Sequence, residues 1–121
     1  MELTPLVQPG RQVIERYGAS GFRISGTVYL GPVLVFPDRT VAWEAAAATI
    51  EGLTPVVDHG GVELLLLGLG RHMVPVAAVL RAALKASGIA VEAMDTGAAC
   101  RTFNVLLAED RRVAAALLPP V

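Results

Sequence analysis

The chain has 121 residues, of which 54% are hydrophobic and 17% charged, and its formal net charge is −1. This length suits one domain with a core of its own, and the near-neutral balance excludes the strongly basic surface typical of nucleic-acid binding. The single cysteine excludes an intramolecular disulfide framework and a cysteine-based zinc site, and it fits a reducing compartment.

The first residues carry prolines and charges instead of the apolar core of a signal peptide. We expect residues 1–12 to form a flexible tail and residues 13–121 to form a single α/β domain. Glycine and proline interrupt the hydrophobic runs well short of the ~20 residues that a membrane-spanning helix needs. The sequence therefore predicts a soluble, cytoplasmic protein without a transmembrane segment.

The first third of the chain predicts short β segments separated by glycine-rich turns. We expect an antiparallel meander of four strands, at Val13–Tyr17, Phe22–Ser25, Thr27–Leu30 and Val33–Phe36. The stretch Val41–Gly52 is ambiguous, because its four consecutive alanines favour a helix whereas Val41–Trp43 can continue the extended region. We favour a short strand at Val41–Trp43.

A brief helix is expected next, with Thr54 as its cap and Pro55 in its first turn, ending before Gly60. The leucine-rich run Val62–Leu67 indicates a central parallel strand that is buried on both faces.

The segment Pro75–Ser87 has the apolar stripe of an amphipathic helix, and Gly88 suits the position just after its end. A short apolar run around Val91 follows. These elements predict a β-α-β unit with parallel strands and a right-handed crossover.

The C-terminal part reads as turn, helix and strand. We expect Thr96 to cap a helix that runs to about Glu109, because a threonine hydroxyl can accept from a free amide of the first turn. The apolar run Val113–Leu118 then predicts a closing strand, with a second helix as the alternative. The fold class expected is three-layer α/β, in which a mixed central sheet combines the parallel β-α-β unit with an antiparallel closing strand.

The parallel unit places the segments after its two strands at one edge of the sheet, where open α/β sheets bind ligands. Helix N-termini near Pro75 and Gly97 would add free amides and partial positive charge. We therefore hypothesise an anion-binding crevice made by Gly68, Gly70, Arg71, Asp95, Thr96, Gly97, Arg101 and Asn104. Structural alternatives stay open, because tight turns need glycine and Asp95 can bond the turn amides that follow it. Arg101 can equally form an ion pair with Glu109 or Asp95.

No residue set indicates catalysis or a metal site. Cys100 next to Arg101 could favour a thiolate, but a lone cysteine is more often a buried packing residue. Neither His59 nor His72 has a second ligand at metal spacing. We expect Trp43 to lie in the core, with a role as a partner anchor as the alternative.

The motif from Met94 to Asn104, with Gly21–Ile24, Trp43 and Leu64–Gly70, resembles a domain-of-unknown-function family of MTH-type proteins. This family includes the mitochondrial complex I (NADH dehydrogenase) assembly factor three. The resemblance covers about Val13 to Leu118, and it implies a three-layer α/β fold with an accessory β-hairpin. Leu69 stands where the family typically has threonine, and Phe103 where it often has tyrosine, so two hydroxyls that a ligand could use are absent.

The resemblance implies a non-enzymatic binding or assembly-factor domain that acts through protein–protein contacts. Its partners would be proteins, including subunits of a membrane complex, and it could self-associate. We expect no nucleic-acid partner, no cofactor and no metal. The alternative is a small-molecule or anion-binding protein, or an enzyme, that uses the strand-end crevice.

Overall fold

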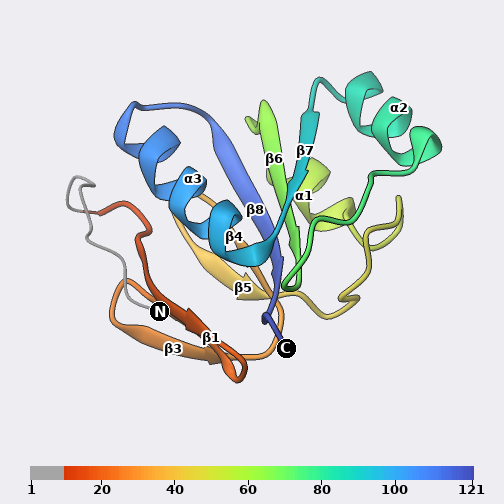
Figure 1. Cartoon of the computed structure of the whole chain (residues 1–121). Helices are drawn as coiled ribbons and strands as arrows, with labels where there is room; N and C mark the ends of the chain where they lie inside the picture. The colour runs from red at the N-terminus through yellow and green to blue at the C-terminus, as the bar shows by residue number, and fades with distance from the viewer. Residues whose placement is uncertain (1–9) are drawn as a thin grey trace.

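The computed structural model describes residues 10–121, which form eight strands and three helices (Figure 1). The N-terminal half contains β1 (Ile14–Gly18), β2 (Gly21–Ile24), β3 (Thr27–Leu30), β4 (Val33–Val35), β5 (Thr40–Ala42) and α1 (Thr54–His59). The C-terminal half contains β6 (Leu64–Leu69), α2 (Ala78–Ala86), β7 (Ala90–Met94), α3 (Thr96–Ala108) and β8 (Val113–Leu118). Residues 1–9 of the expected tail lie outside the described residues. Within that tail, the backbone N–H of Gln12 donates to the carbonyl of Pro37 at 3.0 Å.

The central sheet has the strand order β5-β4-β8-β6-β7 and is mixed, as predicted. β6 pairs in parallel with both β7 and β8, and α2 connects β6 to β7. The closing strand β8 is antiparallel to β4 but parallel to β6, so the expectation of an antiparallel closing strand holds for only one of its two neighbours. The observed strand also excludes the alternative of a second C-terminal helix.

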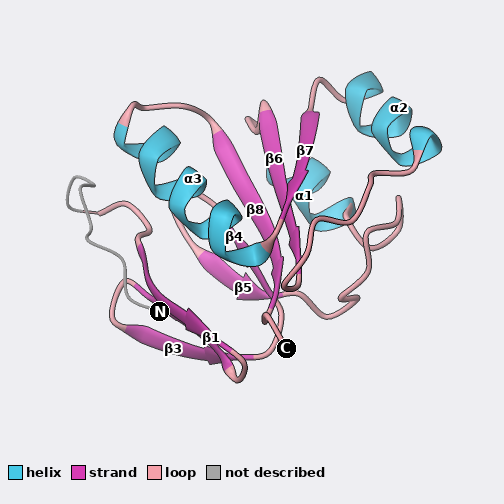
Figure 2. Cartoon of the chain, in the orientation of Figure 1, coloured by secondary structure: helices cyan, strands magenta, loops and turns pink. Residues whose placement is uncertain are grey.

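The molecule has the predicted three layers, as Figure 2 shows. Helices α1 and α2 cover one face of the central sheet, and α3 together with the sheet β1–β3 covers the other. The leucine run explains this, because successive residues of a strand point to opposite faces. Leu65 and Leu67 lie in the core beneath α1 and α2, whereas Leu66 lies in the core beneath α3. Both faces of β6 are therefore buried.

The predicted four-stranded meander is wrong in its last member. β1, β2 and β3 form an antiparallel sheet of their own, whereas β4 pairs with β5 and β8 in the central sheet. Gly31, at a φ of 93°, redirects the chain between β3 and β4. All three residues of β4 are at most 1% exposed, and such a strand needs cover on both faces, which an interior position in the central sheet provides.

The ambiguous stretch Val41–Gly52 is not helical. β5 spans Thr40–Ala42, one residue earlier than expected, and an irregular loop follows it. Trp43 is buried, as predicted, and its indole N–H donates to the carbonyl of Gly52 at 2.8 Å. This hydrogen bond closes the loop over the alanine run and overrides the helix propensity of those alanines.

Three expected helix starts differ from the structure. Thr54 is the first residue of α1, so Leu53 and not Thr54 occupies the cap position. α2 begins at Ala78 instead of Pro75. The residues just before it are not helical, although Val76 among them packs against the core. α3 is capped by Asp95 instead of Thr96, since the Asp95 carboxylate accepts from the N–H of Ala98 at 2.9 Å.

Candidate functional site

The ends of the three parallel strands meet at one edge of the central sheet, as the β-α-β prediction required. Thr96 is fully buried there and links all three strand ends. Its hydroxyl accepts from the N–H of Gly70 at 2.9 Å and donates to the carbonyl of Leu118 at 2.7 Å. Its own N–H donates to the carbonyl of Gly70 at 2.8 Å. The predicted meeting of the segments after β6 and β7 is therefore observed.

Two of the predicted glycines are explained by close packing at this junction. A Cβ atom on Gly68 would lie 2.9 Å from the Cα of Thr96, and one on Gly97 would lie 2.6 Å from the phenolic oxygen of Tyr17. Both glycines are buried. The first turn of α3 is thus covered by β6 on one side and by the Tyr17 ring on the other.

Arg101 and Asn104 lie further along α3 and contact β1. The guanidinium of Arg101 donates to the Tyr17 hydroxyl at 3.1 Å. Among the described residues, no ion pair joins Arg101 to Asp95 or Glu109, so that structural alternative is wrong. Asn104 is buried, accepts from the N–H of Ile14 at 3.0 Å and donates to its carbonyl at 2.9 Å. The proposed crevice residues therefore divide between the strand-end junction and the β1 contact.

Arg71 stands apart from both groups, in the exposed loop after β6. Next to the junction is an open cleft of about 610 Å³. Gly70 and Arg71 are the two residues of the predicted crevice that line it, together with Ala19, Leu69, His72, Val74, Leu118, Pro119 and Val121. Binding of an anion in this region stays a prediction, and Arg71 is the predicted cation that faces the cleft.

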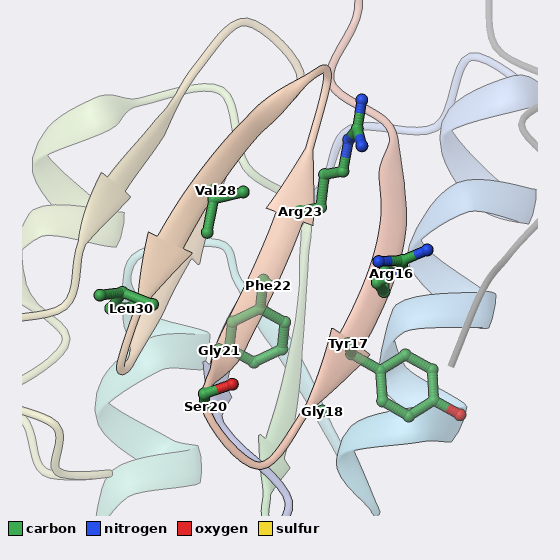
Figure 3. Close-up of a pocket in the computed structure, with 9 residues that line it drawn as sticks. All are labelled: Arg16, Tyr17, Gly18, Ser20, Gly21, Phe22, Arg23, Val28 and Leu30. Atoms are coloured by element: carbon green, nitrogen blue, oxygen red, sulfur yellow. The ribbon is translucent and has the colours of Figure 1, made fainter.

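A second hollow, of about 400 Å³, lies on the outer face of the sheet β1–β3 (Figure 3). Strand alternation places Phe22 and Ile24 inside the core, and it turns Arg23 outward. Val28 and Leu30 on β3 are 66% and 81% exposed on this outer face. The sequence interpretation did not single out this surface, although Thr27–Leu30 carries apolar residues in both alternation phases, which a strand with one solvated face does not need.

The lone cysteine and the histidines have ordinary surroundings. Cys100 is fully buried, and its burial raises the pKa of the thiol to about 12, so packing and not reactivity describes it. His59 stacks on Phe36 and bonds Asp38 through Nε2 at 2.7 Å, which lowers the pKa of the Asp38 carboxyl. Within residues 10–121, no three His, Cys, Asp or Glu side chains gather as a metal site would require.

The sequence profile of the family described as "Protein of unknown function (DUF498/DUF598)" matches residues 14–118. The chain belongs to this family. An uncharacterised protein of Rhodobacter capsulatus is 38% identical to this chain over 112 residues, covering 91% of this chain and 86% of that protein. The NADH dehydrogenase [ubiquinone] 1 alpha subcomplex assembly factor 3 of Danio rerio is also 38% identical over 112 residues. The resemblance to the family of complex I assembly factor three is thereby confirmed.

Solved structures of similar chains show the same fold. A structure described as an outer membrane protein of Bartonella henselae superposes with a TM-score of 0.82 at 37% identity, covering 93% of this chain and 98% of that one. A Mth938-like domain of Bordetella pertussis gives a TM-score of 0.75 at 29% identity, covering 98% and 92%. The α/β fold that the sequence implied is thus confirmed by independent structures.

This chain spans only about three-fifths of the length of the named assembly factors that it matches. The match spans 89% of this chain but 64% of the Danio rerio protein. In the described part of the chain, the helices are too short or too polar to cross a membrane.

Proposed function

We propose that this chain is a non-enzymatic, assembly-factor-like domain that works by binding other proteins. Relatives that match about nine-tenths of the chain are named as assembly factors of NADH dehydrogenase. The partners proposed for this chain are therefore subunits of a membrane-bound respiratory NADH dehydrogenase, met from the cytoplasmic side of the membrane. Self-association is part of the same proposal.

The outer face of the sheet β1–β3 carries this proposal. Leu30 is 81% exposed and Val28 66% exposed, and both project from β3, the outermost strand of that sheet. Within the described residues, no other strand pairs with the free edge of β3. Exposed apolar side chains grouped on one face mark an interaction surface more often than single scattered ones do. A protein partner that covers this face would bury both side chains.

The experiment is a chromosomal deletion of the gene in the source organism, with native electrophoresis and proteomics of the membrane fraction. We expect assembled NADH dehydrogenase to fall and partly assembled forms to accumulate. Plasmid-borne wild-type chain should restore assembly, whereas Leu30→Glu should restore it poorly. Val79→Glu on α2, which alters another exposed apolar side chain, is the matched control. Normal levels of assembled enzyme in the deletion strain would refute the assembly role.

Location and self-association are tested with the same tagged strain. We expect most of the chain in the cytoplasmic fraction. A smaller amount should be found on membranes, and only when NADH dehydrogenase subunits are present. Size-exclusion chromatography with light scattering measures whether the purified chain forms dimers. A chain recovered only from the periplasm would contradict the proposed location.

A second candidate function is the binding of a small anion in the strand-end cleft. It is favoured by the guanidinium-bearing Arg71 beside Gly70 in a cleft of about 610 Å³. Thermal-shift titrations with phosphate, nucleotides and small carboxylates test it, with Arg71→Ala and Arg101→Ala as variants. Loss of a shift with Arg71→Ala alone would place the anion in the cleft, and loss with Arg101→Ala would place it nearer the α3 contact with Tyr17. The absence of any shift would remove this candidate.

A further inference from the structure

We infer that the hollow on the outer face of β1–β3 binds an extended, acidic segment of a protein partner, which inserts a bulky apolar side chain and places a carboxylate two residues away. This inference rests on the proposed protein-binding function and specifies its partner. It is carried by the order of side chains across the three strands, the open space above Gly18 and the charge of the neighbouring row.

The strand register arranges the outer face in two rows. Gly18 pairs with Gly21, and Gly21 pairs with Leu30, so the first row is two bare backbones beside one exposed leucine. A Cβ atom on Gly18 would meet nothing within 4 Å, so the space above this residue is open, whereas a Cβ atom on Gly21 would lie 2.0 Å from the carbonyl oxygen of Tyr29. The glycines therefore provide a shallow seat for one large apolar side chain, and the exposed Leu30 lies at the outer end of the row (Figure 3).

The second row is cationic. Arg16 pairs with Arg23, and Arg23 pairs with Val28, so two guanidinium groups and one valine stand next to the glycine row. Arg23 contacts the Glu15 carboxylate through Nε at 3.4 Å, and its side chain is still 51% exposed. The two terminal amino groups of a guanidinium make bidentate contact with a carboxylate. This row complements an acidic partner and opposes a basic one.

The spacing between the rows defines the segment. Residues two apart in an extended chain point to the same side and lie about 7 Å apart. An apolar residue over the Gly18 row would thus be followed or preceded, two positions away, by a side chain over the Arg23 row. The occupant is an apolar-x-acid segment that runs along the strands.

A second copy of this chain is a poorer occupant than a different protein. Its own apolar-x-acid spacings include Phe36 with Asp38 and Leu107 with Glu109, and in both the apolar member is no more than 1% exposed. Two copies joined face to face would also bring their Arg16–Arg23 rows together. Charge complementarity therefore favours a partner of another sequence.

The test is an NMR titration of the ¹⁵N-labelled full chain with the capped peptide Ser-Phe-Ser-Glu-Ser. One anchor and one exposed ion pair correspond to a dissociation constant on the order of 1 mM. We expect saturable shifts centred on Gly18, Gly21, Arg23 and Leu30. The peptides Ser-Phe-Ser-Lys-Ser and Ser-Ala-Ser-Glu-Ser should bind much more weakly. Equal binding of the lysine peptide, or shifts centred on Arg71, would overturn the inference.

Variants separate the two rows. Gly18→Leu fills the seat and should abolish binding. If Gly18→Leu does not fold, Leu30→Ser tests the same row, because it removes the apolar side chain at the outer end of that row. Arg23→Gln should weaken the affinity for the glutamate peptide about two- to fivefold, the size expected of an exposed ion pair. Val79→Glu on the opposite side of the molecule should bind as wild type does. Wild-type binding by Gly18→Leu and Leu30→Ser, with folded spectra, would also refute the inference.

The outcomes distinguish this inference from the proposed function. If deletion impairs NADH dehydrogenase assembly but the peptide gives no shifts on this face, then the assembly role stands and this docking mode falls. If the peptide binds as described but deletion leaves assembly unchanged, then the surface is confirmed and the assembly role falls.

Discussion

The side chain of Asn104 on α3 pairs with both backbone groups of Ile14 on β1, although the two residues are 90 positions apart in the chain. Its Oδ1 accepts from the Ile14 N–H at 3.0 Å, and its Nδ2 donates to the Ile14 carbonyl at 2.9 Å. Both residues are buried. This amide replaces a missing strand neighbour and anchors the sheet β1–β3, with its candidate docking face, to the main domain.

Replacing Asn104 with alanine should therefore destabilise the fold. Both backbone groups of Ile14 would lose their partner inside the core, and we expect a loss of about 2–4 kcal/mol in the free energy of unfolding. Urea denaturation measures the loss, and hydrogen exchange should show the Ile14 amide exposed first. Val105→Ala, at a 55% exposed position on the same helix, is the control and should stay within about 0.5 kcal/mol.

The strand-end junction makes a similar prediction for Thr96. Thr96→Val keeps the shape but removes the hydroxyl that bonds Gly70 and Leu118, so the partly buried N–H of Gly70 loses its acceptor. We expect a loss of about 1–3 kcal/mol. Thr96→Ser retains the hydroxyl and should lose less than the valine variant. Equal stability of the valine variant and the wild type in urea would show that these hydrogen bonds contribute nothing net.

The architecture of the central sheet was largely predictable, because it follows from local patterns. Four leucines in a row between turn signals indicate a strand buried on both faces, and a helix and a second apolar run after it indicate a parallel neighbour. The sheet to which β4 belongs was not predictable in this way. Its apolar residues suit either sheet, and the choice depends on pairing with β8, some 80 residues later.

The meeting of the strand ends was predictable, but the hydrogen bonds made there were not. Parallel strands brought Gly70 and Thr96 together, as expected. The hydrogen bonds of the Thr96 hydroxyl depend on where β8 ends, and those of Asn104 depend on the position of β1. Neither role therefore leaves a local signature in the sequence. The docking face was missed because single exposed apolar residues such as Val28 carry little information until the register shows which of them are neighbours.

Two glycine substitutions should have opposite effects. On Gly68, an added methyl group would meet the Cα of Thr96 at 2.9 Å, whereas on Gly18 it would meet open space. Overpacking of this kind costs about 1–3 kcal/mol, so Gly68→Ala should lower the melting temperature. Gly18→Ala should leave it unchanged or raise it, since glycine within a strand costs about 0.5–1 kcal/mol relative to alanine. A comparison of the two melting curves tests the packing directly, and equal losses would contradict it.

Cys100 makes the last prediction, which concerns pH. Burial raises the pKa of its thiol from the ordinary value of 9.0 to about 12, with a smaller opposing contribution from the Arg101 charge. In the unfolded chain the thiol ionises near pH 9, whereas in the folded chain it stays protonated, so stability should fall progressively as the pH rises from about 9 toward 12. Cys100→Ala should flatten this part of the stability curve, although it costs some stability at every pH through lost packing.

Iodoacetamide labelling of the native chain at pH 8 should be slow and should accelerate in denaturant, because only the unfolded chain exposes a thiolate. Rapid labelling of the folded chain would show that α3 opens locally around Cys100.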